Sequence, residues 1–375
     1  MIFIDWFTPG YKAGGPIQSC FNVAYALKDE YEIYVFTSDR DLGSAAPYEG
    51  IVTDKWIQNL HPDINVFYAS KANLAPGLIK NVIADTAPDF IYLNHLFSPL
   101  FVVYPLWLKW QGFMKSTVVV CPRGALYDSA LSIKWYKKWP LLKLFKWMNI
   151  HKKVRFHATN TREKKAILAY FPGSEILIAD NLPNSRQMEF STLSKEKGKL
   201  KCIFIARIHP IKNLHFLLQL LNSVSAAIQL SIVGPMEDAT YWQECVAIIE
   251  KHPKHIEVVY MGAIPNHELS ELLRQHHLFI LPTTGENFGH AIFEAFLAGR
   301  PVLISDQTPW LNLHSAGVGW EISLQDSAAF VNAIDLAANW AQEEFDKHAL
   351  SAWNYAKSFI ENPSLKKQYE ELFHE

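Results

Sequence analysis

Short apolar runs alternate with longer helix-like stretches along the first half of the chain. The runs are bounded by turn residues, as is typical of buried strands, and they span 2–5, 31–38, 64–70, 89–94 and 116–122. Stretches with helical spacing lie between them, at 14–30, 72–86 and 97–111. Strands and helices that alternate in series require crossover connections, so the pattern predicts a parallel sheet with helices on both faces.

The alternation starts again after a polar stretch rich in Ser, Lys and Gly at 191–200. The strands predicted there span 201–207, 228–234, 256–262, 278–282 and 301–305, with a helix at 214–223. The sequence therefore predicts an α/β protein of two doubly wound domains, with boundaries at 1–185 and 186–350 and a helical tail at 351–375. Ligands bind beyond the carboxyl ends of strands in such sheets, so we expect two facing domains to form a central cleft.

Composition limits the class of protein without naming its chemistry. A chain of 375 residues with 49% hydrophobic and 19% charged residues is typical of a folded protein with two cores. The formal net charge of -2 argues against a general nucleic-acid binder. Residues 1–180 carry 20 Lys/Arg against 15 Asp/Glu, whereas the remainder carries 15 against 22. This difference in sign indicates two domains with different partners.

Cysteine spacing and the opening residues indicate the compartment. Cys20, Cys121, Cys202 and Cys245 lie far apart and form no CxxC pair, which favours neither a zinc site nor a disulfide framework. The first residues show no basic region followed by a cleavage site, and no apolar run reaches the ~18–20 residues that span a bilayer. We therefore expect a cytoplasmic protein.

The stretch "TTGENFGHAIFEAFLAG" at 283–299 carries two acids around a glycine. It follows a predicted strand, and the helix that it opens should end at Gly299. Gly289 would then lie near a helix N-terminus, where N–H groups and the helix dipole favour a phosphate. Glu286 and Glu294 could accept hydrogen bonds from sugar hydroxyls on either side of it. The alternative is a helix with two solvated carboxylates.

Two cations follow the first predicted strand of the second domain. Arg207 and Lys212 in "ARIHPIKNL" would lie at the carboxyl end of that strand, where a ligand is expected. Two cations in one turn can neutralise a diphosphate leaving group. The alternative is two solvated surface charges.

The R-x4-K pattern followed by "ENFGHAIFEAFLAGRPVL" resembles the retaining nucleotide-sugar glycosyltransferases of the GT-B fold (glycosyltransferase family 4, group 1). That large family includes many bacterial polysaccharide and lipid glycosyltransferases. "PGYKAGGPIQSCFNVAYAL" resembles its first glycine loop, and "VVVCPRGALYDSAL" resembles a segment of a subgroup that builds surface polysaccharides. The resemblance implies two Rossmann-like domains, the first binding the acceptor and the second the donor, with a tail that crosses back to the first.

The resemblance also implies roles for individual residues. The donor-binding set would be Gly14, Gly15, Arg207, Lys212, Gly262, Ile264, Glu286, Asn287, Phe288, Gly289, His290, Ala291 and Glu294. The acceptor-binding set would be His95, Arg123 and Gly124, and the catalytic set Glu286, Arg207, Lys212 and His95. No metal and no other cofactor is expected, because the cations and the helix end supply the positive charge. The nucleotide sugar, a UDP- or GDP-sugar, would be a substrate.

Several positions depart from the family pattern or stay ambiguous. Many relatives have His where this chain has Arg123, so Arg123 could instead contact a phosphate on the acceptor. Asn213 replaces a common Gly, a change that we expect to be tolerated. His95 follows a strand and should face the cleft, where it could orient a substrate or serve only as a structural hydrogen-bonding group. His157, within a strand pattern, is expected to be structural.

The segment 132–156 carries eight Lys/Arg, no acid and three tryptophans. A basic, aromatic-rich amphipathic helix can lie on an anionic membrane, which would place the protein at the inner face of the cytoplasmic membrane. Pro140 should divide the segment into two helices. A helix pair packed on the domain with a solvated basic face is the alternative, and nucleic-acid binding is disfavoured.

The resemblance therefore implies a hexosyltransferase that moves a sugar from a nucleotide diphosphate to a glycan acceptor, which we expect to be lipid-linked, in capsule or lipopolysaccharide synthesis. The absence of a convincing carboxylate nucleophile favours a front-face retaining mechanism. Two other classes remain open. A sugar-nucleotide epimerase of the same fold would also have a diphosphate cleft, and a non-catalytic glycan- or lipid-binding relative would have no need of Glu286, Arg207 and Lys212 together.

Overall fold

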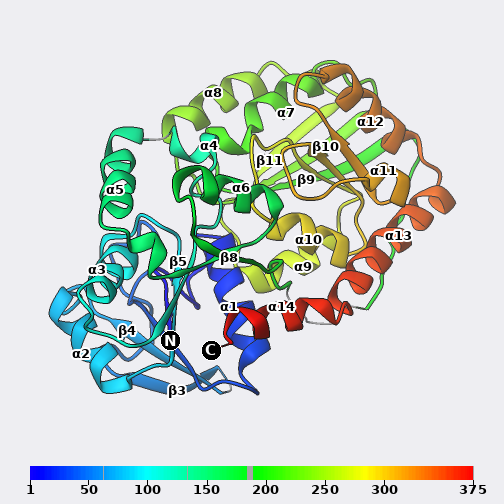
Figure 1. The fold of residues 1–375 in the computed structure, drawn as a ribbon. Coiled ribbons are helices and arrows are strands. Elements are labelled where there is room, and N and C mark those ends of the chain that lie inside the picture. Colours follow the sequence, from blue (N-terminus) through cyan, green and yellow to red (C-terminus); the bar gives the residue numbers. More distant parts are fainter. Residues whose placement is uncertain (62, 133, 184–188, 375) are drawn as a thin grey trace. The chain divides into compact units, whose positions relative to one another are not determined.

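A computed structural model describes residues 1–375 except 62, 133, 184–188 and 375 (Figure 1). The chain divides into two compact units, Met1–Leu182 with Pro363–Glu375, and Pro183–Asn362. The domain boundary predicted between residues 185 and 186 lies outside the described residues. Each unit has its own sheet and its own core.

The first unit is built on an eight-stranded sheet with the order β3-β4-β2-β1-β5-β6-β7-β8. The strands are β1 Ile2–Phe3, β2 Ile33–Ser38, β3 Trp56–His61, β4 Ile64–Ala69, β5 Phe90–Asn94, β6 Thr117–Cys121, β7 Arg155–Ala158 and β8 Glu175–Ile178. All neighbours pair in parallel except β3, which runs antiparallel to β4 at the edge. The strand order reverses between β1 and β5, and this is where open α/β sheets bind ligands.

Helices cover the sheet of the first unit. They are α1 Gly15–Leu27, α2 Pro76–Thr86, the π-helical turn η1 Pro99–Val103, α3 Tyr104–Trp110, α4 Asp128–Leu131, α5 Trp135–Trp147, the 3-10 turn η2 Ile150–Lys152, α6 Thr161–Tyr170 and α14 Ser364–Leu372. In the described part of the chain, no helix of either unit has the length and apolar character needed to cross a bilayer.

The prediction that Pro140 divides the basic segment into two helices was wrong, because α5 runs through it. Pro140 lacks the N–H that would bond to the carbonyl of Tyr136 one turn earlier. Tyr136 is 57% exposed, so water can reach that part of the helix and the missing bond does not end it. Residue 133 of the predicted segment lies outside the described residues.

The last helix of the chain, α14, belongs to the first unit. The Arg155 guanidinium of β7 donates to the carbonyl oxygens of Leu372 and His374, at 2.8 and 2.9 Å. The backbone N–H of Asp180 donates to the side chain of Gln368 at 2.8 Å. The preceding helix, α13 (Gln342–Ile360), lies in the second unit, so residue 351, where the tail was predicted to begin, falls within α13.

The second unit is built on a six-stranded parallel sheet with the order β11-β10-β9-β12-β13-β14. Its strands are β9 Lys199–Ile205, β10 Ala227–Val233, β11 Ile256–Tyr260, β12 Leu278–Leu281, β13 Val302–Ser305 and β14 Gly319–Ile322. Its helices are η3 Pro210–Lys212, α7 Leu214–Leu221, α8 Ala239–Ile249, α9 Asn266–Arg274, α10 His290–Leu297, α11 Leu313–Ala316, α12 Ser327–Asn339 and α13. The order reverses between β9 and β12, which predicts a ligand site beyond those two strands.

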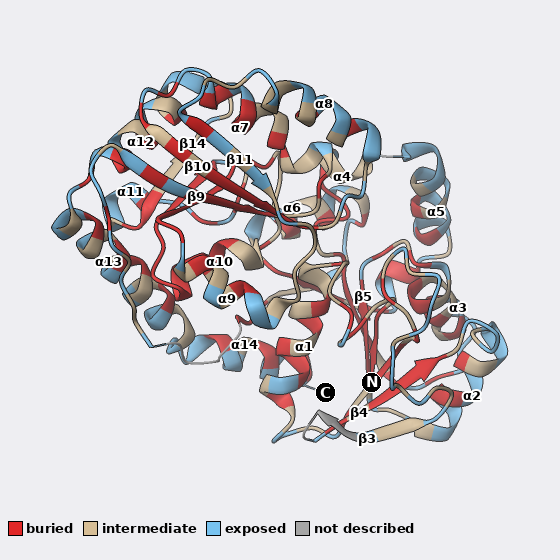
Figure 2. Ribbon diagram, turned by 180° about the vertical axis from the view of Figure 1, so that it is seen from behind, coloured by how far each residue is buried: buried red, intermediate tan, exposed pale blue. Residues whose placement is uncertain are grey.

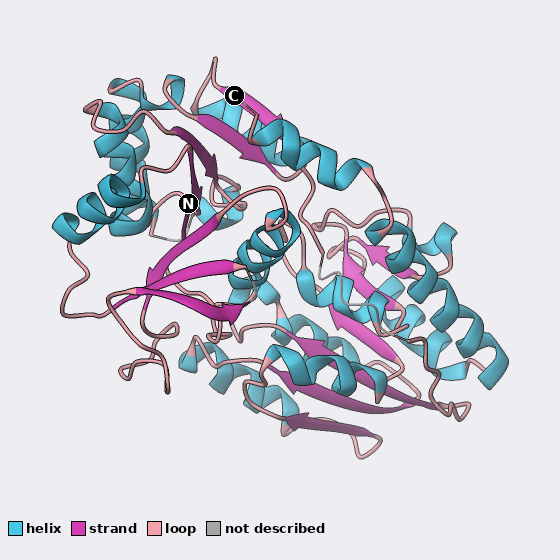
Figure 3. Cartoon of the chain, turned by 90° about the horizontal axis from the view of Figure 1, so that it is seen from below, coloured by secondary structure: helices cyan, strands magenta, loops and turns pink. Residues whose placement is uncertain are grey.

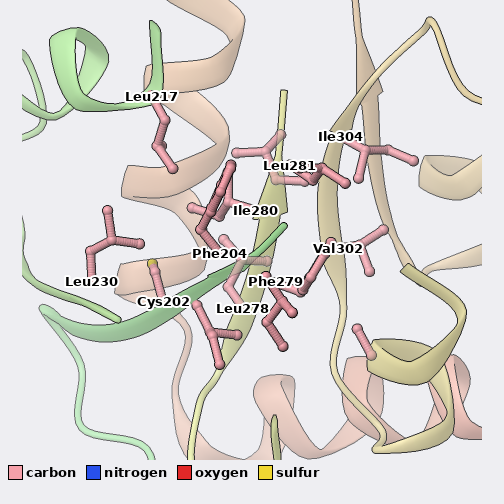
Figure 4. Close-up of a cluster of buried hydrophobic side chains, with 14 of the residues drawn as sticks. Cys202, Phe204, Leu217, Leu230, Leu278, Phe279, Ile280, Leu281, Val302 and Ile304 are labelled. Carbon is pink, nitrogen blue, oxygen red and sulfur yellow. The ribbon is translucent and has the colours of Figure 1, made fainter. Parts of the chain in front are cut away.

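The predicted α/β fold with parallel sheets is confirmed in both units. Helices flank the strands of each sheet in Figure 3, and the central strands are the most buried elements in Figure 2. Figure 4 shows why the apolar runs could be recognised. All side chains of β12 and β13 are buried, and so are those of β9 except Lys199 and Lys201. Leu217 of α7 and Leu230 of β10 belong to the same buried cluster. A strand buried on both faces appears in the sequence as a continuous apolar run.

Two buried histidines are held neutral by their surroundings. In the first unit, His157 accepts a hydrogen bond from the Tyr92 hydroxyl at 2.7 Å and donates to the carbonyl of Ala179 at 2.8 Å. Burial lowers the pKa of His157 to about 3. In the second unit, His277 accepts from the N–H of Lys201, and burial lowers its pKa to about 4. Both histidines are structural groups, as expected for His157.

We predict that the free energy of unfolding falls as the pH drops from about 6.5 towards 4. The unfolded chain takes up protons on His157 and His277 in that range, and the folded chain does not. Each histidine should contribute a slope of about 1.4 kcal/mol per pH unit. Urea titrations at pH 7, 6 and 5 measure this slope. His277→Gln should reduce the slope by the contribution of one histidine, about 1.4 kcal/mol per pH unit. An unchanged slope would show that His277 is charged in the folded protein.

Candidate active site

The loops that follow β9 and β12 are joined by hydrogen bonds to a single carbonyl oxygen. That oxygen belongs to Ile211, in the turn η3 after β9. It accepts from the N–H of Thr284 at 2.8 Å and from the hydroxyls of Thr283 and Thr284 at 3.1 and 3.2 Å. The carbonyl of Thr283 in turn accepts from the Ser305 hydroxyl at 2.5 Å. The two loops at the reversal of strand order therefore hold each other in place.

The hydrogen bonds between these loops bring together two residues that the sequence analysis placed in one site. Lys212, next to Ile211, forms an ion pair with Glu286, which is 74 residues away in sequence. Their side chains are only 15% and 13% exposed. The backbone of Glu286 is fixed as well, because its N–H donates to the carbonyl of Gln307 at 3.0 Å. A cation and an acid are thus positioned together at the carboxyl edge of the sheet.

The second predicted cation, Arg207, is paired less firmly. Its guanidinium lies 2.5 Å from the carboxylate of Glu237, a residue that the sequence analysis did not select. Both side chains are 36% exposed, and pairs in such surroundings contribute only ~0–1 kcal/mol. Arg207 can therefore exchange this carboxylate for a ligand phosphate at little cost.

Gly289 is the residue before α10, and only glycine fits its position well. Its φ of 79° lies in the left-handed region, and an added Cβ would lie 2.7 Å from the side chain of Ile292. Phe288 anchors the same loop, because its ring is buried and its carbonyl accepts from the Trp310 indole at 2.5 Å. The loop therefore presents its backbone at the N-terminus of α10. An anion is favoured there, and the first turn of α10 contains no acid.

The other residues predicted for this stretch lie in the same loop or on α10. Asn287 lies in the same loop, and the ring of His290 packs at 4.8 Å on the ring of Phe288. Ala291 and Glu294 lie on α10, and both are half-buried. Burial raises the pKa of Glu294 to about 7. Within the described part of the chain, this carboxyl group forms no hydrogen bond or ion pair, which leaves it available to a ligand.

Two glycines shape the neighbouring strand ends. Gly234 follows β10, and an added Cβ would overlap the carbonyl oxygen of Ala206 at 1.9 Å, directly before Arg207. Its N–H donates to the carbonyl of Gly262 at 2.8 Å, and Gly262 has a φ of 74°. Sequence reasoning selected Gly262 and the half-buried Ile264 but missed Gly234. A glycine directly after a buried strand was the available signal, since it marks a close backbone approach.

In the first unit, the glycine loop after β1 is shaped by a buried acid. The carboxylate of Asp41 accepts from the N–H groups of Tyr11 and Lys12, at 2.8 and 3.1 Å. Gly14 precedes α1 with a φ of 67°, and Gly15 is the first residue of that helix. Asp41 was not selected from the sequence, because its partners are backbone groups that no motif reveals.

His95 and Arg123 follow β5 and β6 at the carboxyl edge of the first sheet. Both have positive φ, 74° and 54°, which is uncommon for residues with a side chain and is often found at functional sites. The N–H of His95 donates to the carbonyl of Cys121 at 2.9 Å, which joins the two strand ends. The side chain of His95 is exposed.

The side chain of Arg123 and the backbone of Gly124 form hydrogen bonds within the first unit. The guanidinium donates to the Tyr92 hydroxyl at 3.0 Å, to the Asn94 side chain at 3.3 Å and to the side chain of Asn181. The N–H of Gly124 donates to the buried carboxylate of Glu163 at 2.6 Å. A phosphate on the acceptor would have to compete with the three neutral partners of Arg123.

The second unit is similar in sequence to known proteins. Residues 185–349 match the family model described as glycosyl transferases group 1. The chain is similar to the O-antigen chain mannosyltransferase B of Escherichia coli, with 29% identity over 112 residues, 28% of each chain. The chain spans 40% or less of the length of the curated relatives that it matches.

Solved structures are similar over nearly the whole chain. WaaG, a glycosyltransferase involved in lipopolysaccharide biosynthesis, has a TM-score of 0.66 at 13% identity, covering 99% of this chain and 98% of that one. HepE of Anabaena, in complex with UDP and glucose, has a TM-score of 0.71 at 14% identity, again covering 99% and 98%. Residues 185–349 are therefore similar to the glycosyl transferases group 1 family, and the chain as a whole has the GT-B fold.

Proposed function

We propose that the chain is a retaining glycosyltransferase that moves a sugar from a UDP- or GDP-sugar to a lipid-linked glycan acceptor in the synthesis of a bacterial surface polysaccharide. The observation that carries the proposal is the Lys212–Glu286 pair, fixed beside the N-terminus of α10 at the reversal of strand order. A cation, an acid and a helix end lie together here, and a sugar diphosphate has a part for each. The cation can bind the phosphates, the acid can accept hydrogen bonds from the sugar hydroxyls, and the helix end can stabilise the leaving oxygen.

In this proposal the second unit holds the donor. Arg207 and Lys212 bind the diphosphate, and the backbone from Phe288 to Ala291 contacts its β-phosphate. Glu286 accepts hydrogen bonds from the donor sugar, and Glu294 accepts them from the ribose. The positive charge of the two cations and the helix end makes a resident metal unnecessary for neutralising the phosphates.

The proposed transfer takes place on one face of the sugar. The bond between the anomeric carbon and the β-phosphate oxygen breaks, and the acceptor oxygen forms its bond to that carbon from the same side. The proton of the acceptor hydroxyl passes to the departing phosphate oxygen, whose charge Arg207 and Lys212 stabilise. We propose that the first unit binds the acceptor, with His95 orienting its hydroxyl.

The relatives support the polysaccharide context. One relative is an O-antigen chain mannosyltransferase, and one similar structure belongs to a protein of lipopolysaccharide biosynthesis. Another similar structure contains UDP and glucose, which supports a nucleotide-sugar donor. A lipid-linked acceptor would place the enzyme in the cytoplasm, at the inner face of the membrane.

We predict that UDP or GDP raises the melting temperature of the protein by several degrees without added metal. A ligand at 100 times its Kd stabilises a protein by about 2.7 kcal/mol. Arg207→Ala or Lys212→Ala should weaken nucleotide binding by roughly 10- to 100-fold, since each removes a charge-assisted hydrogen bond. A thermal-shift titration measures the effect.

The matched control is Lys254→Ala, which removes an exposed lysine of the same unit. It should bind nucleotide as the wild type does. Lys212→Ala leaves Glu286 without its partner, so Arg207→Ala provides a second variant whose stability should change less. If neither nucleotide stabilises the wild type, the donor site is misassigned and the non-catalytic alternative takes its place.

We also predict that a nucleotide sugar releases a proton from Glu294 when it binds near pH 6.5. The pKa of about 7 leaves this group largely protonated there, and two ribose hydroxyl donors favour the carboxylate. Calorimetry in buffers of different ionisation enthalpy counts the protons. Release should decline towards zero by pH 8.5 and be lost in Glu294→Gln. Equal release from that variant and the wild type would assign the proton to another group.

A further inference from the structure

All the tryptophans that the described chain leaves exposed lie on two helices of the first unit, α3 and α5. Trp107 and Trp110 of α3 are 40% and 38% exposed. Trp135, Trp139 and Trp147 of α5 are 62%, 50% and 79% exposed. Elsewhere in the described residues, tryptophan is buried or half-buried. Five exposed indoles gathered on two helices form an apolar surface that a monomeric soluble protein rarely maintains without a partner.

Core packing does not account for these indoles. The inner face of α5 contributes Leu142 and Phe145 to the core of the unit. The exposed positions of the helix carry the tryptophans together with Tyr136 and Leu144, which are 57% and 44% exposed. Large apolar side chains are therefore exposed to solvent between the lysines of α5, outside the core.

A hydrogen bond links the end of α3 to the segment that follows α5. The ammonium of Lys153, directly after η2, donates to the carbonyl of Trp110 at the end of α3, at 3.3 Å. Figures 1 and 2, drawn from opposite sides, both place α3 and α5 next to each other. Phe113, 39% exposed, extends the surface beyond α3. We call this the Trp–Lys face; its residues are Trp107, Trp110, Phe113, Trp135, Trp139, Leu144, Trp147 and the lysines around them.

The charged residues around the Trp–Lys face are almost all basic. Residues 90–162 contain twelve Lys/Arg and one acid, Asp128. Seven of the lysines are exposed: Lys115, Lys134, Lys137, Lys143, Lys146, Lys152 and Lys153. Some stand directly beside the indoles, as Lys143 does, with its ammonium 3.5 Å from the ring centre of Trp139. The partner must therefore offer negative charge and an apolar phase at the same place.

We propose that the Trp–Lys face docks the protein on the surface of an anionic lipid bilayer. Indole rings favour the boundary between headgroups and acyl chains, and lysines at this depth are attracted to acidic headgroups. A second copy of the chain fits poorly, because a two-fold contact would set like charges against each other. A nucleic acid would engage the lysines but offers no apolar phase for Leu144 and Phe113.

This inference deepens the proposed function, on which it rests for its biological purpose, by naming the partner of the first unit. A membrane that carries the lipid-linked acceptor would then be the surface on which the protein works. The docking itself depends only on α3, α5 and their lysines, so it can be tested without any transfer reaction.

Vesicle flotation with the full-length protein provides the test. The protein should float with phosphatidylcholine vesicles that contain about 30 mol% phosphatidylglycerol. It should float less with vesicles of pure phosphatidylcholine. High salt should weaken the binding, because the lysine contribution is screened. Replacing Lys137, Lys143 and Lys146 together by Gln should reduce the affinity by roughly 100-fold. Replacing Trp135, Trp139 and Trp147 by Ala should reduce it at least tenfold and leave weak, salt-sensitive binding.

A matched control carries three Lys→Gln changes at Lys197, Lys251 and Lys254, exposed lysines of the second unit. It should bind vesicles as the wild type does. Nucleotide binding, measured on the same preparations, should be unchanged in the tryptophan variant, which shows that this variant is folded. If vesicle binding is absent or insensitive to the tryptophans, the docking proposal fails while the transferase proposal stands.

Two other results would overturn the assignment of the partner. Single-stranded DNA that binds the wild type tightly and displaces vesicles would identify a nucleic-acid surface. Self-association that the tryptophan variant abolishes, without vesicle binding, would identify an interface between copies. If the wild type does not bind nucleotide but floats with vesicles in a tryptophan-dependent way, the transferase proposal is wrong and the docking proposal stands.

Discussion

The candidate donor site depends on the hydrogen bonds accepted by one atom, the carbonyl oxygen of Ile211. Backbone and hydroxyl donors of Thr283 and Thr284 converge on it and fix the loop after β12 against the turn after β9. Lys212 and Glu286 can form their partly buried pair only because these two loops are fixed. Buried polar backbone groups must find partners, so the same requirement that satisfies this carbonyl also assembles the charged groups.

Backbone conformation determines how closely a ligand can approach these groups. Gly289 and Gly234 occupy positions where a Cβ would meet neighbouring atoms, so both loops stay close to the strand ends. Asn213, directly after Lys212, has a φ of 60°. Asparagine tolerates the left-handed region better than most residues, which explains why a residue with a side chain can occupy this position. His95 and Arg123 share this conformation at the edge of the first sheet.

The sequence was most informative where burial and function impose a linear pattern. Central strands could be located because they are buried on both faces, and Lys212 and Glu286 because each follows a predicted strand. The edge strands β3, β8 and β14 were missed, because their apolar runs are short or interrupted by polar residues. Asp41 and the inward hydrogen bonds of Arg123 could not be foreseen, because their partners are distant in sequence. The uninterrupted course of α5 through Pro140 depends on solvent exposure, which a linear pattern does not report.

Hydrogen exchange with and without a nucleotide diphosphate can locate the ligand without knowledge of the sugar or the acceptor. UDP or GDP should slow amide exchange in 206–214 and 283–292, the two loops joined at Ile211. No comparable effect is expected in the loops at the opposite edge of the same sheet, such as 222–226. Protection confined to other segments, or none with either nucleotide, would contradict the assignment of the donor site to these loops.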